Sequence, residues 1–315
     1  MRRILITGGA GFVGSCLSEK LIQDPENYVV IVDDLSTGEL IKLPKLPKTN
    51  WRFIKCNVND YRDIAAIMQS FPFDYVFHYA AVVGVHRTQN NPVTVLHDIH
   101  GIANILNLSK SSNVKRVIFS SSSEVYGEPV ELPQNELTTP LNSRVPYAVV
   151  KNIGEAYLKS YKKEFDLDYT IFRFFNTYGP KQSRDFVMSR FISLALKDQN
   201  ISIYGDGSQT RTFCYIDDNI DACYNNFIKS ITEKKPVNDI INIGNDVEIS
   251  ILDLAKKIIE ITGSKSKIVH RPPLPEGDMQ RRLPDITKMK KLLKRDLLPL
   301  EEGIKKILAN LQYIK

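Results

Sequence analysis

A tyrosine and a lysine four residues apart, Tyr147 and Lys151, could together take a proton from a hydroxyl group. Residues four apart on a helix lie on the same face, so the Lys151 ammonium can approach the Tyr147 phenol. A nearby positive charge favours the phenolate and lowers the pKa of the phenol from its usual value of about 10. A phenolate stabilised in this way is a competent base. Because the same spacing often occurs on solvated helices, the pair gains meaning only from the residues that accompany it.

A glycine-rich segment near the start of the sequence is suited to binding phosphate groups. It runs Thr7-Gly8-Gly9-Ala10-Gly11-Phe12-Val13-Gly14 and lies between a predicted strand and a predicted helix. Such glycines permit a tight turn and a close approach of the backbone to a pyrophosphate, while the helix N-terminus offers N–H groups to the phosphates. The alternative, a glycine-rich turn without a ligand, is disfavoured by this position between strand and helix. The segment therefore predicts a dinucleotide site.

Two acidic residues, Asp33 and Asp34, end the second predicted strand at about the distance from the glycines that dinucleotide sites use. A carboxylate here accepts hydrogen bonds from the adenosine ribose and repels the additional phosphate of NADP. We therefore expect NAD as the cofactor and Asp33 as the ribose acceptor. We expect Asp34 to point toward the turn or the solvent.

Along the chain, short apolar runs alternate with helical stretches up to residue 173. The predicted strands are residues 4–7, 28–32, 51–55, 75–78, 116–120 and 169–173, and the predicted helices are 14–23, 60–70, 92–111 and 147–164. This alternation indicates βαβ units, and strands that are apolar on both faces are typical of a buried parallel sheet. The predicted fold class is α/β, with a Rossmann-type doubly wound parallel sheet.

The pattern changes after residue 173. A loop rich in Asn, Gly and Pro (176–182), a helix (187–197), a polar turn (205–208), a strand (240–243), a helix (251–262) and a Pro-rich charged segment (270–284) follow. We expect an NAD-binding domain over residues 1–176 with a return segment at about 213–245. A smaller C-terminal lobe, over 177–212 and 246–315, is expected to bind the substrate.

Composition narrows the class of protein. The chain has 315 residues, 43% of them hydrophobic and 25% charged, which is ordinary for a globular protein. Its formal net charge of +6 is dispersed, which favours an anionic small molecule over nucleic acid as partner. No run approaches the roughly 18 apolar residues of a membrane span, and the apolar run before Gly8 is too short for a signal peptide. We expect a cytoplasmic protein without a membrane partner.

The cysteines and histidines do not form a recognisable metal-binding pattern. The four cysteines, Cys16, Cys56, Cys214 and Cys223, lack CxxC pairs and nearby histidines at metal-ligand spacing. His78 ends a predicted buried strand, and packing is its expected role. No metal is predicted.

Six stretches carry a resemblance to a known family: TGGAGFVGS (7–15), FHYAA (77–81), SSSSEVYGE (120–128), PYAVVK (146–151), RFFNTYGP (173–180) and YGDGSQTRTFCYIDD (204–218). In these stretches and their order, the chain resembles the extended short-chain dehydrogenase/reductase family, and within it the nucleotide-sugar epimerases, dehydratases and decarboxylases. The resemblance covers nearly the whole length. It implies an enzyme in which NAD oxidises the sugar of a nucleoside-diphosphate sugar, commonly at C4.

The resemblance also assigns roles to individual residues. It makes Tyr147 the base, lets Ser122 share the hydroxyl proton, and has Lys151 bind the nicotinamide ribose. The residues that it places against NAD are Gly8, Gly11, Phe12, Val13, Gly14, Asp33, Asn57, Val58, Ala80, Tyr147 and Lys151. Those that it places near the substrate are Ser123, Asn176, Arg211 and Arg282. Guanidinium groups bind phosphate oxygens bidentately, and Arg281 competes with its neighbour Arg282 for that role.

The sequence indicates the reaction that follows oxidation less clearly than it indicates the family. SSEVYG, GDGSQTRTF and residues 277–285 are most similar to UDP-glucuronate decarboxylases, whereas residues 82–88 and Val145-Pro146 depart from them. Ser123 stands where the dehydratases usually carry Asp, which disfavours dehydration. Glu124 either moves a proton near C5 or only organises its loop. Asp98 stands where the family usually has Asn, and Asn57 stands where the family commonly has an Asp that contacts adenine.

We therefore predict an NAD-dependent epimerase or decarboxylase type of enzyme that oxidises a nucleotide sugar. The alternatives are a plain C4 dehydrogenase that releases the 4-keto product, a 4,6-dehydratase, and an NAD-binding regulator that has lost the chemistry. The retention of Ser122, Tyr147 and Lys151 together favours the enzyme. The resemblance further suggests a homodimer built from the helices at 92–111 and 147–164.

Overall fold

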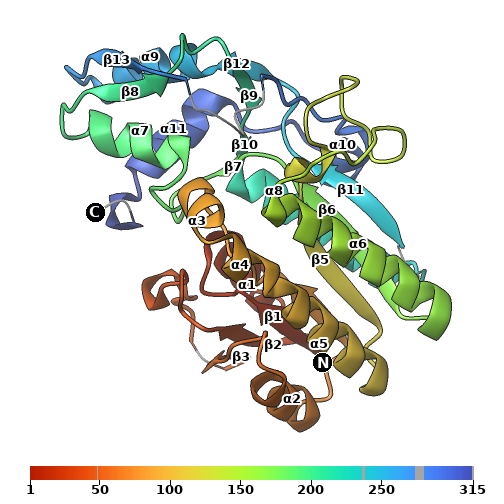
Figure 1. Cartoon of the computed structure of the whole chain (residues 1–315). Helices are drawn as coiled ribbons and strands as arrows, with labels where there is room; N and C mark the ends of the chain where they lie inside the picture. The colour runs from red at the N-terminus through yellow and green to blue at the C-terminus, as the bar shows by residue number, and fades with distance from the viewer. Residues whose placement is uncertain (48, 236–237, 274–279, 314–315) are drawn as a thin grey trace. The chain divides into compact units, whose positions relative to one another are not determined.

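The computed structural model describes residues 1–47, 49–235, 238–273 and 280–313, which contain one seven-stranded sheet (Figure 1). The strand order is β11-β6-β5-β4-β1-β2-β3. The bounds are β1 Arg2–Thr7, β2 Asn27–Asp33, β3 Trp51–Lys55, β4 Tyr75–His78, β5 Arg116–Ser122, β6 Asp168–Phe174 and β11 Asp239–Ile243. β1 pairs in parallel with β2 and β4, β2 with β3, and β4 with β5. Strands extend outward from β1 in both directions, so the predicted doubly wound α/β fold is confirmed.

The helices that alternate with these strands in the sequence pack on the sheet. They are α1 Phe12–Ile22, α2 Tyr61–Ser70, α3 Val85–Asn90, α4 Pro92–Leu96, α5 Asp98–Ser111, α6 Pro146–Phe165 and α8 Ile216–Thr232, with short 3-10 turns η1 Leu40–Lys42 and η2 Ser123–Tyr126. α5 packs along α6, and α6 packs on β5 (Figure 1). The helix predicted at 60–70 begins at Tyr61 because Asp60 is its N-cap, with its carboxylate accepting from the Arg62 N–H.

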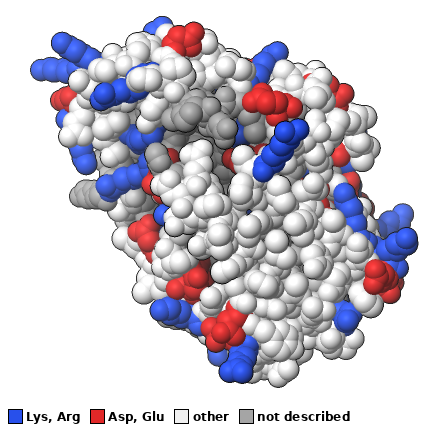
Figure 2. Space-filling view, in the orientation of Figure 1, with Lys and Arg blue, Asp and Glu red and all other residues white. Residues whose placement is uncertain are grey.

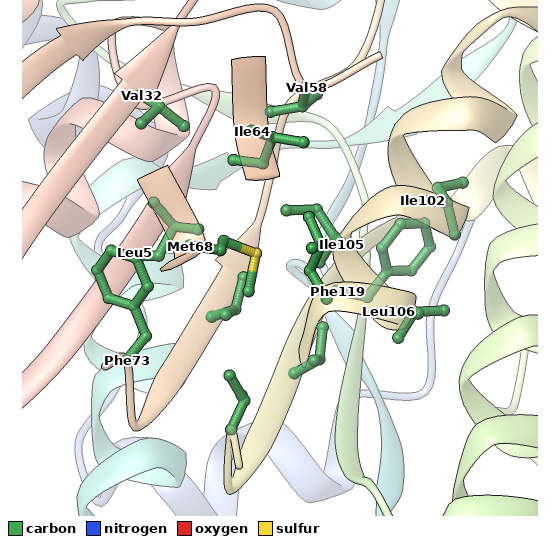
Figure 3. Close-up of a cluster of buried hydrophobic side chains, with 14 of the residues drawn as sticks. Leu5, Val32, Val58, Ile64, Met68, Phe73, Ile102, Ile105, Leu106 and Phe119 are labelled. Carbon is green, nitrogen blue, oxygen red and sulfur yellow. The ribbon is translucent and has the colours of Figure 1, made fainter. Parts of the chain in front are cut away.

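A cluster of buried hydrophobic side chains joins the sheet to α2 and α5 (Figure 3). Leu5 of β1, Met68 of α2, Ile105 of α5 and Phe119 of β5 are among its members, and all are at most 2% exposed. Full burial of such side chains stabilises the fold by about 1.5–3 kcal/mol each. The cluster thereby holds β1 and β5 firmly, and these strands carry the polar residues discussed below at their carboxyl ends.

The prediction of a single helix over residues 92–111 is wrong, because the helix is interrupted at His97. α4 ends at Leu96 and α5 starts at Asp98. At the junction the His100 N–H bonds to the His97 carbonyl, a three-residue spacing that replaces the regular four-residue one. The Asp98 side chain accepts from the Val82 N–H in the loop after β4, and this contact between distant segments was not visible in the helical periodicity.

The remaining strands are short, and the remaining elements were only partly predicted. They are β7 Thr177–Tyr178, α7 Val187–Ala195, β8 Ile201–Tyr204, β9 Thr210–Thr212, β10 Cys214–Tyr215, β12 Glu248–Ser250, α9 Ile251–Thr262, β13 Ile268–Arg271, α10 Thr287–Leu293, α11 Leu300–Leu308 and η3 Leu311–Tyr313. β9 pairs with β12 in antiparallel fashion, and β8 with β13 in parallel. The segment at 270–284 was predicted only as Pro-rich and charged, and its first two residues belong to β13. Strands this short are defined by their partner and not by their own sequence pattern.

The chain divides into two compact units. Unit 1 comprises Met1–Val125, Pro146–Arg173 and Ile220–Ile241, and unit 2 comprises Tyr126–Val145, Phe174–Asn219 and Asn242–Lys315. The assignment of NAD to one predicted domain and of substrate to another remains a prediction. Within the described part of the chain, no helix combines the length and apolar character needed to cross a bilayer.

Candidate active site

The glycine-rich turn after β1 packs closely against other backbone atoms, and its contact with a pyrophosphate stays a prediction. Gly8 has φ +68°, and a Cβ there would lie 2.6 Å from the Ala80 backbone nitrogen. A Cβ at Gly14 would lie 2.4 Å from the Gly8 carbonyl oxygen. Gly11 is the N-cap of α1 and has no side chain to accept a hydrogen bond from the first turn. The first N–H groups of the helix are therefore not capped by a side chain and can donate to a ligand at the helix N-terminus. This cradle fits the pyrophosphate of a dinucleotide.

Asp33 lies at the carboxyl end of β2 and its carboxylate is already bound to the backbone. Oδ2 accepts from the Ala10 N–H at 3.0 Å and Oδ1 from the Leu35 N–H at 2.8 Å. Burial raises the pKa of the Asp33 carboxyl, and these two N–H groups oppose the rise. Each carboxylate oxygen keeps a second lone pair for a ribose hydroxyl. Asp34 is exposed and accepts from Ser36, as predicted for the residue that points to the turn.

The Thr7 hydroxyl at the end of β1 connects this strand to the end of β4. The Thr7 Oγ1 accepts from the N–H groups of Tyr79 and Ala80, each at 3.1 Å, and lies 2.8 Å from the His78 Nδ1. Because both lone pairs of Oγ1 are used, its proton goes to Nδ1, and His78 carries its own proton on Nε2. Burial lowers the pKa of His78 to about 3, so the ring is neutral. The expected packing role of His78 is confirmed.

Lys151 of α6 is buried beneath the end of β5. It is 2% exposed, and its Nζ donates to the Ser120 carbonyl at 2.7 Å. Nζ also lies 5.7 Å from the centroid of the Tyr147 ring. Burial lowers the pKa of Lys151 to about 8, and the charge of Asp98 opposes this by raising it. The Lys151 amine is therefore mostly protonated at pH 7. Its positive charge lies close to the Tyr147 ring, as the sequence predicted.

Asp98 anchors the loop between β4 and α3. Its Oδ2 accepts from the Val82 N–H at 2.7 Å and its Oδ1 from the Asn59 Nδ2 at 3.3 Å. Burial raises the pKa of the Asp98 carboxyl. The replacement of a usual Asn by Asp thus places a buried carboxyl within electrostatic reach of Lys151.

Ser122 ends β5 and is followed directly by η2. Its Oγ accepts from the Glu124 N–H at 3.2 Å, which orients the serine toward the start of this turn. Ser122 and Ser123 are buried, and Glu124 is half-buried. Ser122, Tyr147 and Lys151 all belong to unit 1, and the contact between Lys151 and Ser120 links helix α6 to the strand that carries Ser122.

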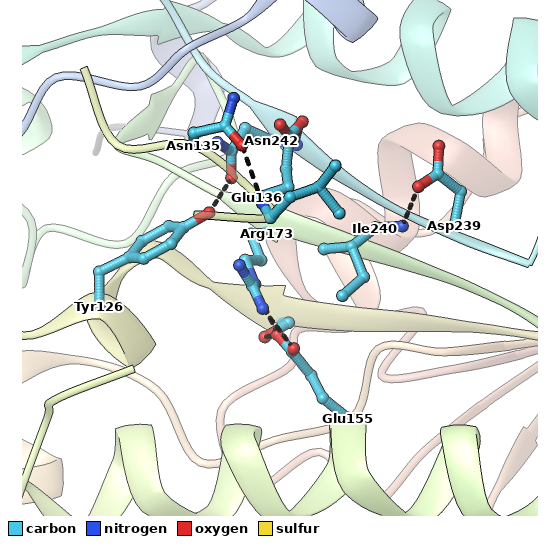
Figure 4. A network of polar contacts seen from close by, with 10 residues as sticks. Tyr126, Asn135, Glu136, Glu155, Arg173, Asp239, Ile240 and Asn242 are labelled. Carbon is cyan, nitrogen blue, oxygen red and sulfur yellow. Dashed lines mark hydrogen bonds and ion pairs between the residues drawn. The ribbon is translucent and has the colours of Figure 1, made fainter. Parts of the chain in front are cut away.

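A buried ion pair beside this site was missed by the sequence prediction. Glu155 and Arg173 form a bidentate pair, with Nε to Oε1 at 2.8 Å and Nη2 to Oε2 at 2.6 Å (Figure 4). The Ser121 hydroxyl donates to the same Glu155 Oε1 at 2.6 Å. The pair therefore holds the residue that precedes Ser122. Glu155 follows Lys151 by four positions on α6, a same-face spacing that could have indicated its place.

The other residues predicted near NAD occupy varied environments in unit 1. Asn57 is exposed, and its Oδ1 accepts from the Asn59 N–H at 3.0 Å. Val58 is buried, whereas Phe12, Val13 and Ala80 are half-buried. Their contacts with NAD stay a prediction.

The residues predicted near the substrate lie in unit 2, apart from Ser123. Asn176 donates from Nδ2 to the Thr212 carbonyl at 3.2 Å, and Arg211 donates from Nη1 to the Thr210 carbonyl at 2.7 Å. Arg282 is buried. Arg281 is exposed and forms a bidentate pair with Glu248. The choice between Arg281 and Arg282 as phosphate ligand stays a prediction.

The segment that carries Arg282 is tied to the loop after η2. The Gln134 N–H donates to the Leu283 carbonyl at 2.7 Å, and the Asp285 N–H donates to the Gln134 carbonyl at 2.8 Å. Asn242 donates to that same carbonyl and accepts from the Tyr126 hydroxyl at 2.7 Å (Figure 4). Of the segment 277–285 used for the family resemblance, Gly277, Asp278 and Met279 lie outside the described residues.

Surface charge, disulfides and metal-ligand clusters do not mark out a further site among the described residues. On the face in Figure 2, Lys and Arg side chains are interspersed with Asp and Glu, as the sequence predicted. None of the four cysteines is in a disulfide. The described ranges contain no group of three His, Cys, Asp or Glu side chains arranged to hold a metal ion.

Comparisons with known proteins agree on one family. A model of the NAD dependent epimerase/dehydratase family matches residues 4–244. A putative UDP-glucose 4-epimerase of Methanocaldococcus jannaschii is 35% identical over 311 residues, covering 96% of both chains. A UDP-N-acetyl-alpha-D-glucosaminuronate decarboxylase of Bacillus cytotoxicus is 35% identical over 305 residues, covering 92% of this chain and 91% of that one. The crystal structure of Thermotoga maritima UDP-glucose 4-epimerase with UDP-glucose superposes with a TM-score of 0.90 at 32% identity, covering 98% of each chain.

Proposed function

This chain belongs to the NAD-dependent epimerase/dehydratase family, and on that premise we propose that it oxidises C4 of a sugar carried on a nucleoside diphosphate. The protein is an enzyme that uses NAD, and its relatives are nucleotide-sugar epimerases, decarboxylases and dehydratases. The observation that supports the proposal is the position of Lys151, whose Nζ lies 5.7 Å from the Tyr147 ring and donates to the Ser120 carbonyl of β5, the strand that ends at Ser122. NAD, when bound, accepts the hydride from the sugar carbon.

Tyr147 acts as the base in this proposal. Its phenol oxygen takes the proton of the sugar hydroxyl, and Ser122, whose Oγ is held by the Glu124 N–H, relays or shares that proton. The protonated Lys151, 5.7 Å from the Tyr147 ring, favours the phenolate electrostatically. The same ammonium donates to the nicotinamide ribose, since one of its protons is used by the Ser120 carbonyl and others remain.

Arg211 and Arg282 are proposed to bind the diphosphate. Both guanidinium groups are buried in unit 2, and a planar fork matches two oxygens of a phosphate. Asn176 and Ser123 are proposed to contact the substrate nearby. NAD contacts are proposed for the glycine cradle, Asp33 and the residues that the sequence placed beside them.

The step after oxidation is proposed to be epimerisation or decarboxylation. Relatives of equal identity bear either name, which supports this pair of reactions over a single one. A 4,6-dehydratase is disfavoured because Ser123 cannot act as the acid that water elimination requires. Release of the 4-keto sugar is the second candidate, since Ser122, Tyr147 and Lys151 suffice for hydride transfer alone.

A panel of nucleotide sugars tests the proposal. UDP, GDP and dTDP sugars, with hexose and uronate forms of each, are mixed with the NAD-loaded protein. The absorbance of reduced nicotinamide, the product mass and, for products of unchanged mass, the chromatographic retention of the sugar are followed. We expect one class of sugar to reduce the cofactor and yield an epimer or a product lighter by carbon dioxide. The matched variant Tyr147→Phe should retain NAD but lose oxidation by about 10²–10⁴-fold. Full oxidation by that variant would contradict the role of Tyr147.

A further inference from the structure

Helix α6 approaches β5 closely near the carboxyl end of the strand. A Cβ at Gly154 would lie 2.5 Å from the Phe119 Cζ, so the helix backbone comes to a distance that leaves no room for a side chain there. Three residues earlier on the same helix, the Lys151 Nζ donates to the Ser120 carbonyl at 2.7 Å. The separation between α6 and the end of β5 is therefore set by direct contacts.

A buried carboxylate makes the next contact between α6 and β5. The Glu155 Oε1 accepts from the Ser121 hydroxyl at 2.6 Å. The same oxygen accepts from the Arg173 Nε at 2.8 Å, and Oε2 accepts from Nη2 at 2.6 Å (Figure 4). All three side chains are at most 2% exposed, and hydrogen bonds to charged groups are shorter and stronger than neutral ones. Arg173 therefore fixes the carboxylate, and the carboxylate fixes Ser121.

Ser121 lies between two residues that the proposed reaction needs in place. Before it is Ser120, whose carbonyl accepts from the Lys151 ammonium. After it is Ser122, the last residue of β5, which shares the proton of the sugar hydroxyl in the proposed function. The hydrogen bond from Ser121 to Glu155 thus joins the strand to the helix at the position between these two groups.

We propose that Ser121 and Glu155 are positioning residues, which fix the distance between the catalytic serine and the Lys151 ammonium. This rests on the proposed function, in which Ser122 and Lys151 act with Tyr147 on the sugar hydroxyl. The Ser121 hydroxyl is bound inside the fold, so its effect on the sugar passes through the backbone of β5. Misplacement of a reacting group by about 1 Å can slow an enzyme by about 10²-fold. Loss of this contact should therefore act on the rate and not on binding.

Two substitutions separate positioning from stability. Ser121→Ala removes the link between α6 and β5 and leaves the Glu155–Arg173 pair in place. Glu155→Gln keeps a carbonyl oxygen that can accept from Ser121, but its amide nitrogen faces the Arg173 Nη2 and the negative charge is lost. Ser109→Ala is the matched control, because Ser109 is buried in α5 of the same unit and its Oγ has no hydrogen-bond partner among the described residues. The NAD-loaded variants are measured with the UDP, GDP or dTDP sugar that reduces NAD in the wild-type protein.

We expect Ser121→Ala to lower kcat about tenfold relative to Ser109→Ala, while KM and the Kd of NAD change by less than about twofold. Glu155→Gln should lower the melting temperature more than Ser121→Ala does, yet keep more of kcat. A crystal structure of Ser121→Ala should show the Ser122 Oγ displaced relative to the Lys151 Nζ by about 0.5–1 Å.

Equal kcat in Ser121→Ala and Ser109→Ala would overturn the positioning role, and this comparison remains decisive if Glu155→Gln does not fold. A kcat that simply follows the melting temperature across the variants would also overturn it, because the contact would then be structural only. Failure of every sugar of the panel to reduce NAD in the wild-type protein is a different result, since it would contradict the proposed function itself.

Discussion

The two ends of β5 treat buried charge in opposite ways. At the carboxyl end, Arg173 is 2% exposed and bound by both oxygens of Glu155, and Lys151 is 2% exposed and bound to the Ser120 carbonyl. At the amino end, Arg116 is equally buried but has only aromatic faces around it. A cation with an acceptor in the chain fixes the position of its neighbours, whereas Arg116 leaves its buried donors unsatisfied. Burial alone therefore does not show how a charge is stabilised, because equally buried cations differ in their hydrogen-bond partners.

The largest expected effect is loss of the Glu155 carboxylate. Glu155→Ala leaves Arg173 buried without its partner and removes the acceptor of the Ser121 hydroxyl, and breaking a buried pair in this way costs about 3–5 kcal/mol of unfolding free energy. Denaturant titration measures the loss. The double variant Glu155→Leu/Arg173→Met should recover much of it, because no charge is left unpaired. A loss below about 1 kcal/mol in Glu155→Ala would show that the pair is not structural.

Asp33 offers a second partnered charge at the carboxyl edge of the sheet. Asp33→Ala removes the proposed ribose acceptor and its negative charge, so NAD should bind about tenfold or more weakly and the preference over NADP should narrow. Binding of both dinucleotides, followed by calorimetry, checks this. Asp34→Ala is the matched control, because Asp34 is exposed and bonded only within its turn. An unchanged preference in Asp33→Ala would assign discrimination to another residue.

Asp98 should adjust the proton affinity of Lys151. The charge of Asp98 raises the pKa of Lys151, which burial has lowered to about 8, so Asp98→Asn should lower that pKa further. Lys151 is protonated below its pKa, and activity that needs the ammonium is lost as pH rises through it. The alkaline decline of kcat/KM should therefore move to lower pH by up to about one unit. Asn can still accept from the Val82 N–H, so the loop should be kept, and an unmoved decline would contradict the coupling.

The smallest effect is expected at Arg116. Arg116→Met should change the unfolding free energy by less than about 1 kcal/mol or raise it, because an apolar side chain of similar length replaces an unsatisfied cation. Arg173→Met is the matched control and should cost about 3–5 kcal/mol, since it leaves Glu155 unpaired. Equal losses in the two variants would remove the distinction between the two ends of β5.

Local sequence patterns predicted the elements that later hold the site. The strands at 51–55 and 75–78 and the helix at 251–262 have the predicted bounds, because periodic apolar residues and their flanking turns define them without outside help. The glycine turn was equally readable, since Gly8 and Gly14 face backbone atoms that tolerate no Cβ. By contrast, the interruption at His97 depends on Asp98 reaching the Val82 N–H, a contact across sixteen positions of sequence.

What the sequence by itself determined is the α/β fold and the tight glycine turn after β1, because each depends on neighbours a few positions apart. The residues that exchange a proton stay a prediction. Only the tertiary structure decided which charges have partners. Arg281 lies against Glu248, Arg173 against Glu155, and Arg116 against two aromatic rings, and each arrangement joins segments far apart in the chain. The physical reason is that an acceptor for a buried donor comes from whichever segment packs against it, and packing is a property of the folded chain as a whole.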